Sequence, residues 1–384
     1  MTGGLEIREV KTARERRDFL EFPLRLYAGN PCFVPPLYGD EKKIFSKNYV
    51  YYDTCEAVYY LAYRDGKPVG RISGIIQRAS NEIRNEKRVR FTRFDVIDDP
   101  EVSKALFAAV EKWALEKGMD TVCGPLGFSD LEREGLLVDG FDMQSTFEEQ
   151  YNADYYMKHV EALGYEKEVD WVESRIFLPD DIAVVQEMDR MADFILKRYK
   201  LRFGEAKNVN DFIKRYADQL FELLDKSYAK LYGTVPLTEG TKKMLISNFK
   251  LAIDLRFVAV LLDENDRVVC LGVCFPGMAD ALAGGNGKLT PKTVARLLKT
   301  IKHPRVLDLG LVGVEREYLN KGLMTVFFSA FIKMLREENI EYAETNLNLE
   351  DNFAIRNQWK RFRSVEHKRR RSYVKKLTEG PLNG

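Results

Sequence analysis

The spacing of apolar and polar residues along the first half of the chain predicts alternating strands and helices. Residues 5–10 alternate apolar and polar side chains, which is the period of a half-buried strand. Residues 13–26 and 101–117 instead place apolar side chains at helical spacing. Two β-rich runs flank Asp65-Gly66, a dipeptide that favours a two-residue hairpin turn. The remaining elements expected in this half are strands at 89–97, 120–124 and 168–178 and a short helix at 155–164.

The second half shows the same kinds of pattern after an amphipathic segment, residues 180–198, that is expected to be a connecting helix. Asn210 is the expected N-cap of a long helix at 211–231. A glycine-punctuated apolar run at 306–314 predicts a buried strand, and a polar turn with Gly322 leads from it into a helix at 323–335. The other elements expected here are strands at 199–206 and 342–349, helices at 242–253 and 291–302, and a hairpin across 263–267.

Length and composition indicate a globular protein of two domains and argue against several other classes of protein. A chain of 384 residues is expected to form two domains, and 45% hydrophobic with 31% charged residues is typical of a soluble globular protein. The net charge of +1 argues against an overall polyanion binder. No apolar run approaches the ~18–20 residues that span a bilayer, and the N-terminus lacks a signal peptide, so we expect a cytoplasmic protein without a membrane partner. Five scattered cysteines and three histidines favour a reducing compartment and no metal site.

The predicted strand, glycine turn, helix and second strand of residues 306–352 form a β-α-β unit that carries a candidate anion site. The helix that starts after Gly322 has first-turn amides without intrahelical partners, and its dipole favours negative charge. The end of the strand and the start of the helix thus predict an anion site at this turn.

This arrangement resembles the core of the GCN5-related N-acetyltransferase (GNAT) superfamily. In that family, an R/Q-x-x-G-x-G/A turn holds the pyrophosphate of acetyl-CoA, and residues 319–324, LNKGLM, correspond to it. Gly322 occupies the central glycine position, whereas Leu319 and Met324 depart from the Arg/Gln and the small residue. The family's acidic strand and helix-starting Asn are matched in order by residues 344–362, although its usual tyrosine acid is replaced by Gln358 or Trp359.

The resemblance implies an α/β fold of two GNAT-like domains in tandem, each a mixed, mostly antiparallel sheet flanked by helices. The expected boundaries are an N-terminal domain at 1–179, a connecting helix at 180–198 and a C-terminal domain at 199–384. At the turn that corresponds to Gly322, the first half has Ile97-Asp98-Asp99-Pro100-Glu101. Three carboxylates there would repel a pyrophosphate, so we expect the acyl-CoA site only in the C-terminal domain.

The resemblance also implies the site residues. Acyl-CoA, as co-substrate, would be held by backbone and side-chain groups of the strand and of the turn after it: Leu311, Val312, Gly313, Val314, Leu319, Asn320, Lys321, Gly322, Leu323 and Met324. The expected base is Glu344 or Asp308, Tyr318 is a candidate acid, and Asn352 or Asn346 would orient water or the pantetheine amide. Tyr228, Tyr232 and Thr234 are candidates for the acceptor pocket.

Two charged segments leave alternatives open. Residues 130–149 carry seven carboxylates against Arg133, so this loop either recognises a cationic amine or is a solvated surface. Six cations follow between 368 and 376 in a strand-like pattern. That tail is either a solvated edge strand, a contact for the 3′-phosphate of CoA, or a nucleic-acid contact.

We therefore expect an acyl-CoA-dependent N-acyltransferase, with acetyl transfer to a primary amine of a small molecule or peptide as the first hypothesis. One alternative is a FemABX-like enzyme that uses aminoacyl-tRNA, for which the basic tail would serve. The other is a non-catalytic binding protein on a degenerate GNAT fold, as the departures at Leu319 and Met324 would allow.

Overall fold

The computed structural model describes residues 4–345 and 347–377, which form two compact units. Unit 1 contains the chain up to Val172, the segment Ala279–Val294 and the chain from His367 onward. Unit 2 contains Glu173–Met278 and Ala295–Glu366. Two segments from the second half of the chain, Ala279–Val294 and the part from His367 onward, therefore belong to unit 1. The predicted domain boundaries at 179 and 199 stay a prediction. In the part of the chain that is described, no helix is both long and apolar enough to cross a bilayer.

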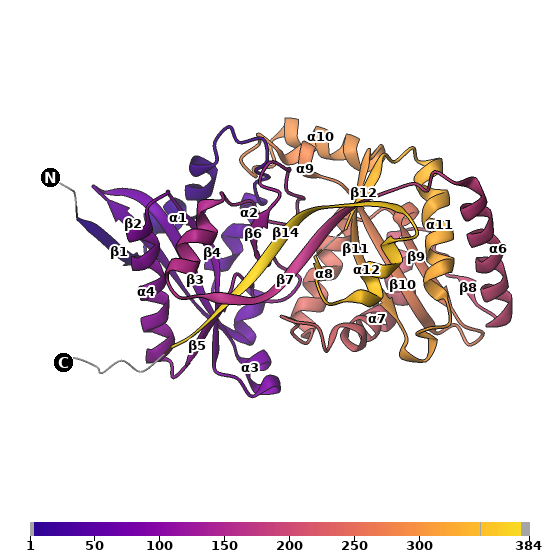
Figure 1. Cartoon of the computed structure of the whole chain (residues 1–384), viewed down its shortest axis with the longest axis horizontal. Coiled ribbons are helices and arrows are strands. Elements are labelled where there is room, and N and C mark those ends of the chain that lie inside the picture. The colour runs from indigo at the N-terminus through magenta and orange to yellow at the C-terminus, as the bar shows by residue number, and fades with distance from the viewer. Residues whose placement is uncertain (1–3, 346, 378–384) are drawn as a thin grey trace. The chain divides into compact units, whose positions relative to one another are not determined.

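Unit 1 is built on a mixed sheet with the strand order β1-β2-β3-β4-β5-β14 (Figure 1). The pairs are antiparallel except for β4 and β5, which run parallel. At the hairpin between β2 and β3, Asp65 and Gly66 both have positive φ, as the sequence predicts for this turn. The strands are β1 (Leu5–Glu9), β2 (Cys55–Arg64), β3 (Lys67–Gln77), β4 (Arg88–Val96), β5 (Thr121–Gly124), β6 (Leu136–Asp139), which pairs with β14, and β14 (Arg363–Lys376).

The core of unit 1 lies between this sheet and α4. The apolar stripe of α4, with Leu106 and Val110, packs on strand residues such as Ile72 and Phe91, all fully buried. Gly70 of β3 allows this close approach, because a Cβ there would lie 2.8 Å from Cδ1 of Leu106. The helices of unit 1 are α1 (Ala13–Leu26), α2 (Tyr38–Glu41), α3 (Arg78–Arg84), α4 (Pro100–Glu116), α5 (Tyr155–Ala162) and α9 (Ala279–Leu282).

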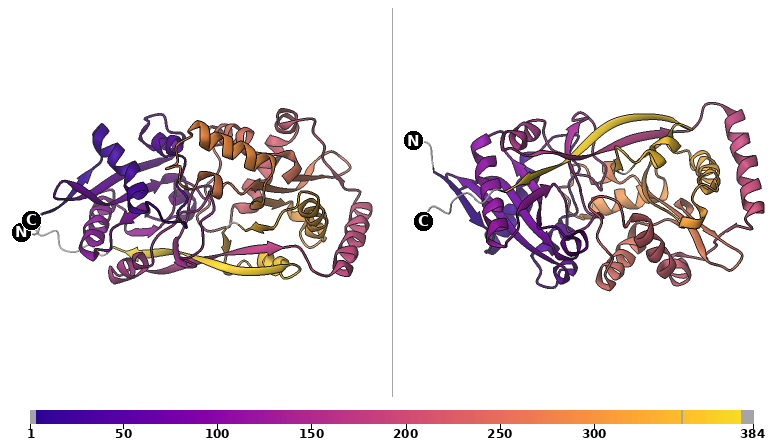
Figure 2. Two further views of the ribbon diagram at one scale, coloured as in Figure 1. Left: turned by 90° about the horizontal axis from the view of Figure 1, so that it is seen from above. Right: turned by 60° about the horizontal axis from the view of Figure 1, so that its bottom comes forward.

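Unit 2 is built on the strands that follow in the same order, β7-β12-β11-β10-β9-β8, with helices on both faces. Alternate residues of β9 point to opposite faces: Val260 packs with α7, whereas Leu261 packs with α6 and α11. The helices α6 and α11 lie side by side (Figure 2). The strands are β7 (Glu166–Phe177), which begins in unit 1, β8 (Arg202–Phe203), β9 (Val258–Leu262), β10 (Val268–Pro276), β11 (Val306–Val314), β12 (Tyr342–Glu344) and β13 (Asn348–Leu349), which pairs with β7. The helices are α6 (Ile182–Arg198), α7 (Val209–Tyr228), α8 (Glu239–Ala252), α10 (Pro291–Lys302), which begins in unit 1, α11 (Leu323–Glu337) and α12 (Phe353–Trp359).

Local predictions in unit 2 were wrong at three places. The N-cap of α7 is Asn208, whose Oδ1 accepts a hydrogen bond from the Asp211 amide at 3.0 Å, and not Asn210. The strand expected at 199–206 is only the two residues of β8, and the strand expected at 342–349 is divided into β12 and β13. For the two strands, the alternating pattern is also compatible with an irregular turn, and tertiary contacts decide where strand pairing stops.

One alternative from the sequence, that the cationic tail is a solvated edge strand, is wrong. β14 lies between β5 and β7 in the strand order, and Lys368 and Arg370 are 2% and 0% exposed. Arg369 and Arg371 both bind Asp170, with N–O distances of 3.1 and 2.8 Å. Lys375 pairs with Glu111, so five of the six cations that suggested a nucleic-acid contact are paired or buried within unit 1, and Lys376 is exposed.

The acidic loop is likewise not a solvated surface throughout. Glu134 and Glu149 are 5% and 6% exposed. Glu132 receives hydrogen bonds from the Tyr49 hydroxyl at 3.0 Å and from the Phe128 amide at 2.9 Å. The buried Glu134 Oε1 has no hydrogen-bond partner among residues 4–345 and 347–377. Burial and the nearby Asp130 carboxylate raise the pKa of Glu134 well above its usual value, which favours the neutral acid.

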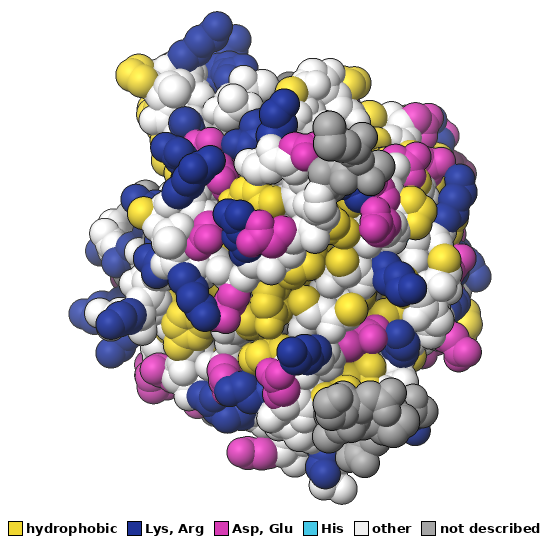
Figure 3. All heavy atoms as spheres, turned by 90° about the vertical axis from the view of Figure 1, so that its left-hand side faces the viewer, with side chains coloured by type: hydrophobic (Ala, Val, Ile, Leu, Met, Phe, Trp, Pro, Cys, Tyr) yellow, Lys and Arg dark blue, Asp and Glu magenta, His cyan; other side chains and the backbone are white. Residues whose placement is uncertain are grey.

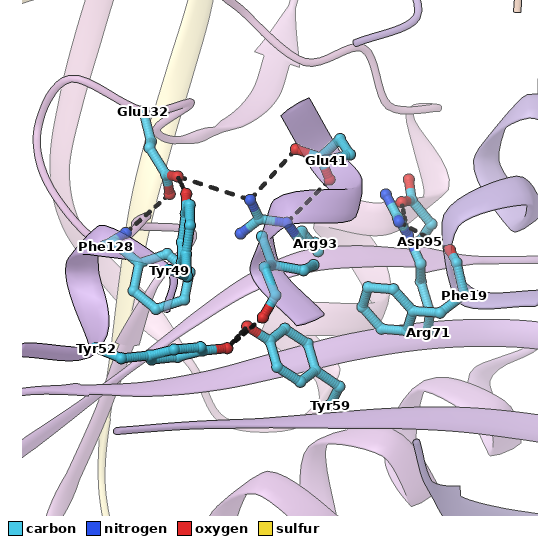
Figure 4. A network of polar contacts seen from close by, with 11 residues as sticks. Phe19, Glu41, Tyr49, Tyr52, Tyr59, Arg71, Arg93, Asp95, Phe128 and Glu132 are labelled. Atoms are coloured by element: carbon cyan, nitrogen blue, oxygen red, sulfur yellow. Dashed lines mark hydrogen bonds and ion pairs between the residues drawn. The ribbon is translucent and has the colours of Figure 1, made fainter. Parts of the chain in front are cut away.

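Arg93 is the centre of the polar network that fills the interior beside β4 (Figure 4). Its guanidinium binds the Glu41 carboxylate through two hydrogen bonds of 3.0 and 3.2 Å and lies 3.7 Å from Glu132. Burial alone would raise the pKa of Glu41, but the charges of Arg93 and Arg71 outweigh it and lower the pKa to about 2. The φ of +49° at Arg93 is unusual for a residue with a side chain, so this network holds a strained backbone in place.

Arg93→Ala should destabilise the protein by about 3 kcal/mol in urea unfolding at pH 7, because it leaves two largely buried carboxylates, Glu41 and Glu132, without their cation. The deficit should shrink as the pH falls from about 4.5 toward 2, where Glu41 becomes protonated in the folded state. Lys112→Ala removes an exposed pair with Glu116 and should cost less than about 0.5 kcal/mol. Equal losses in the two variants would contradict this role of Arg93.

Glu134→Gln should stabilise the protein at neutral pH and make no difference at pH 4. A raised folded-state pKa means that wild-type stability falls as the pH rises above the unfolded value of about 4.5. Asp154→Asn, at an exposed position, should change stability by less than about 0.5 kcal/mol at every pH. Thermal unfolding of the three proteins between pH 4 and 8 measures this, and parallel curves for wild type and Glu134→Gln would overturn the assignment.

Candidate active site

The centre of unit 2 contains a strand that separates from its parallel neighbour. β11 and β12 pair over Val306–Tyr342, Leu307–Ala343 and Asp308–Glu344. β12 ends at Glu344, whereas β11 continues to Val314. Residues 309–312 are partly exposed although β11 lies in the middle of the sheet. The edge of β11 that faces β12 therefore offers backbone groups beyond the paired segment.

A β-bulge lies in the same part of β11. Between the pairs Gly272–Val312 and Cys274–Leu309, two steps along β10 correspond to three along β11. Gly310 fits here because a Cβ would lie 2.5 Å from the ring of Phe275. Bulges redirect backbone groups, and this one bends β11 where it leaves β12.

Tyr228, the last residue of α7, reaches this edge. Its hydroxyl oxygen accepts a hydrogen bond from the Val312 amide at 3.3 Å. Gly313 permits the approach of α7, because a Cβ there would lie 3.2 Å from Leu223 of the same helix. The sequence placed Tyr228 only in the acceptor pocket, whereas the structure places its hydroxyl on the strand expected to hold the thioester arm.

The two candidate bases are direct neighbours. Asp308 and Glu344 are register partners on parallel strands and are each 5% exposed. Arg175 of β7 binds Glu344 with an N–O distance of 3.4 Å. Burial and the Asp308 carboxylate raise the pKa of the Cys274 thiol to about 12, so Cys274 stays protonated and is a poor nucleophile.

The turn after β11 has the geometry of an anion site. Gly322 is the N-cap of α11 and has φ +78°, and a Cβ on it would lie 2.9 Å from Cδ1 of Ile195. Asn320 also has positive φ, at +64°. The amides of Leu323 and Met324 belong to the first turn, where no preceding helical carbonyl is available. Gly322 thus provides a backbone cradle that a side chain would fill.

Two cations lie at this helix terminus. The Lys321 ammonium lies 4.6 Å from the centre of the Tyr318 ring and 5.3 Å from that of Tyr199. Arg361 donates a hydrogen bond to Thr325 Oγ1 at 3.0 Å, in the first turn of α11. Sequence reasoning missed Arg361, because its contact with α11 joins segments 36 residues apart. Leu319, the position of the family's Arg/Gln, is 53% exposed.

The remaining candidates lie apart from the bulge. Tyr318 belongs to the Gly322 turn, and β11 extends about 20 Å from Asp308 to Val314, so Tyr318 and Asp308 cannot contact the same reacting atom. Asn352 is the N-cap of α12, where its side chain accepts from the Ile355 amide at 3.4 Å. Asn346 lies outside the described residues. No group of three or more His, Cys, Asp or Glu among the described residues is arranged to hold a metal ion.

Unit 1 also has a bulged strand that separates from its parallel neighbour, but groups of unit 1 itself fill the opening. β4 pairs in parallel with β5 over Arg88–Arg90 and has a bulge at Arg93. Beyond the pairing, the Leu126 amide donates to the Phe91 carbonyl at 2.9 Å, so a loop continues along β4. At the N-terminus of α4, Asp99 accepts from the Glu101 amide and pairs with Arg64. In unit 1, a loop backbone thus occupies the opened strand edge, and the Asp99 side chain occupies the helix N-terminus.

Comparison with known proteins gives two relatives of similar length. The chain is 28% identical over 385 residues to protein YghO of Escherichia coli, covering 97% of this chain and 95% of that protein. It is 29% identical over 332 residues to a bacterial ceramide synthase of Caulobacter vibrioides, covering 84% of each. No protein-family model matches the chain.

Two solved structures show which fold this is. A tandem GNAT protein from the clavulanic acid biosynthesis pathway superposes with a TM-score of 0.55 and 13% identity, covering 98% of this chain and all of the other. The GCN5-related glucosamine N-acetyltransferase region of a fungal β-N-acetylglucosaminidase gives a TM-score of 0.52 at 12% identity, over 98% of this chain and 38% of that one. The chain therefore shares the fold of a tandem GNAT protein, and each of its units contains a bulged strand that separates from its parallel neighbour.

Proposed function

We propose that this protein transfers an acyl group from acyl-CoA to a primary amine, with the acyl-CoA bound in unit 2. The observation that carries the proposal is the separation of β11 from β12 after Asp308, which leads to the glycine-capped N-terminus of α11. One strand edge and one helix end are thereby aligned for a ligand with an amide-containing arm and a phosphate group.

The residues of unit 2 fit such a ligand. The edge of β11 over residues 311–314 would pair with the amides of the pantetheine arm, as an added strand would. The amides after Gly322, together with Lys321 and Arg361, would bind phosphate oxygens through charge-assisted hydrogen bonds. Leu319 and Met324 supply no charge, so Arg361 would take over the role that the family gives to the first residue of the turn.

The chemistry requires a proton acceptor for the amine and a proton donor for the departing thiolate. Asp308 or Glu344 would accept the proton as the amine nitrogen bonds to the carbonyl carbon. Tyr228 would donate a proton to the sulfur as the carbon–sulfur bond breaks, since a tyrosine hydroxyl that accepts from Val312 is also a donor. Tyr228 would thus replace the family tyrosine that is missing at Gln358 and Trp359.

The nature of the acceptor is suggested by a relative. A ceramide is an N-acylated long-chain amino alcohol, so the similarity to a bacterial ceramide synthase favours a long-chain amine as acceptor and a long-chain acyl group as donor. Apolar, partly exposed residues on β11 suit such chains: Leu309, Leu311 and Val312. Acetyl transfer to a small amine remains the competing hypothesis, and one substrate panel containing both donors distinguishes them.

The aminoacyl-tRNA alternative loses its main support. Its basis was the cationic tail, and five of the six tail cations are buried or paired inside unit 1, all except the exposed Lys376. The non-catalytic alternative predicts acyl-CoA binding without turnover, or no binding, and the two variants below separate it from catalysis.

Gly322→Asp should weaken binding of acetyl-CoA, long-chain acyl-CoA and free CoA by more than about 100-fold in calorimetric titration. The substitution adds a side chain at positive φ, against Ile195, and a negative charge beside the phosphates. Gly322→Ala isolates the steric effect. Asn320→Asp isolates the charge effect, since aspartate tolerates the positive φ found there. Wild-type affinity in Gly322→Asp would remove this turn from the site.

Tyr228→Phe should lower kcat for N-acylation by about 10²–10⁴-fold and leave the affinity for CoA within about twofold, because only the proton donor is lost. Tyr216→Phe is the matched control on the same helix. It removes a structural hydrogen bond to the Glu205 carbonyl, which should cost about 1 kcal/mol of stability without a change in kcat. Unchanged turnover in Tyr228→Phe would exclude Tyr228 as the acid.

A further inference from the structure

We propose that α10 binds the surface of an anionic phospholipid bilayer. This interaction goes beyond the proposed acyl transfer and uses none of its residues. The sequence predicts no membrane partner because none of its segments could span a bilayer, but α10 would lie on the bilayer surface without crossing it.

The charge of this segment has one sign. Residues 281–307 contain no Asp or Glu. Four cations lie in α10 itself: Lys292, Arg296, Lys299 and Lys302. The lysines are exposed, and their ammonium groups have no ion-pair partner among the described residues. Such a helix attracts an anionic surface, and the attraction is greatest at low salt.

Apolar side chains share the exposed face. Val294 is 38% exposed and Leu298, one turn later, is 63% exposed, whereas Thr293 faces inward and is 2% exposed. At 100° per residue, Leu298 lies beside Lys302 on the helix surface. A helix that presents large apolar side chains next to lysines is typical of an interfacial membrane helix, in which the apolar groups enter the headgroup region.

Two other apolar surfaces in the described part of the chain lack this charge pattern. Apolar side chains also gather on the end of unit 1 that carries β1, β2 and α4, but carboxylates and cations both border them (Figure 3). α6 exposes Met191 and Phe194 close to Asp189 and Asp193, which an anionic surface would repel. A nucleic acid would need the lysines of α10 but gain nothing from an exposed leucine, so the bilayer is the favoured partner.

Co-sedimentation of the full-length protein with vesicles tests the proposal in the absence of acyl-CoA. We expect binding to phosphatidylcholine vesicles with about 30% phosphatidylglycerol at about 0.05 M salt, at least about tenfold weaker binding to pure phosphatidylcholine, and weakening by about 0.5 M salt. Because no acyl-CoA is present, failure here is independent of failure of the proposed enzyme activity.

Variants locate the contact. Lys292→Glu with Lys299→Glu and Lys302→Glu should reduce binding at least about tenfold. The control Lys104→Glu with Lys112→Glu and Lys158→Glu changes the net charge equally at exposed positions of α4 and α5 and should stay within about twofold of wild type.

Leu298→Ser, with the charges intact, should weaken vesicle binding by about tenfold at low salt and leave the thermal unfolding temperature unchanged, so it tests the contact even if the lysine triple variant folds poorly. Equal binding to neutral and anionic vesicles, or equal effects of the two triple variants, would overturn the proposal. Binding of transfer RNA but not of vesicles, abolished by the α10 triple variant, would instead assign the helix to nucleic acid.

Discussion

The architecture of unit 2 depends on the point at which parallel pairing between β11 and β12 stops. Up to Asp308 the two strands satisfy each other's backbone groups, and beyond it β11 continues toward the α11 turn with a bulge that bends it away. A separation of this kind exposes backbone donors and acceptors in the interior of a sheet, which is costly unless a partner pairs with them. Tyr228 meets this need in part at Val312, and an extended amide-containing ligand would meet it further.

Unit 1 shows what happens when the same separation is closed by the chain itself. There the bulge residue is Arg93, whose charge is held by Glu41 and Glu132, and the adjacent space contains the rings of Tyr49 and Phe128 (Figure 4). At the N-terminus of α4, which corresponds to the Gly322 position, the Asp99 carboxylate accepts a hydrogen bond from the Glu101 amide. Two units of one fold thus differ in which groups satisfy the opened strand, and this supports the expectation that only unit 2 receives acyl-CoA.

The long-range electrostatic pattern of the chain is easily misread when only the sequence is considered. The cations of β14 are close together along the chain and suggest a binding surface, yet Arg369 and Arg371 are bound to Asp170 in the fold. The cations of α10 are less dense in the sequence, but they remain exposed beside Leu298. A cation can contribute to a binding surface only if the fold leaves it exposed and not paired with a carboxylate.

The sequence by itself determined the elements whose patterns are local. The Asp65-Gly66 turn, the stripe of α4, the run of β11 and the glycine before α11 follow from hydrogen-bond geometry and side-chain period within a few neighbouring residues, and the structure has each of them.

Only the tertiary structure decided that Tyr228 reaches Val312, that Arg361 reaches the first turn of α11, and that β14 is an interior strand. These contacts join residues far apart in the sequence, and their energies depend on burial and on the partner that lies opposite. No local pattern records either quantity.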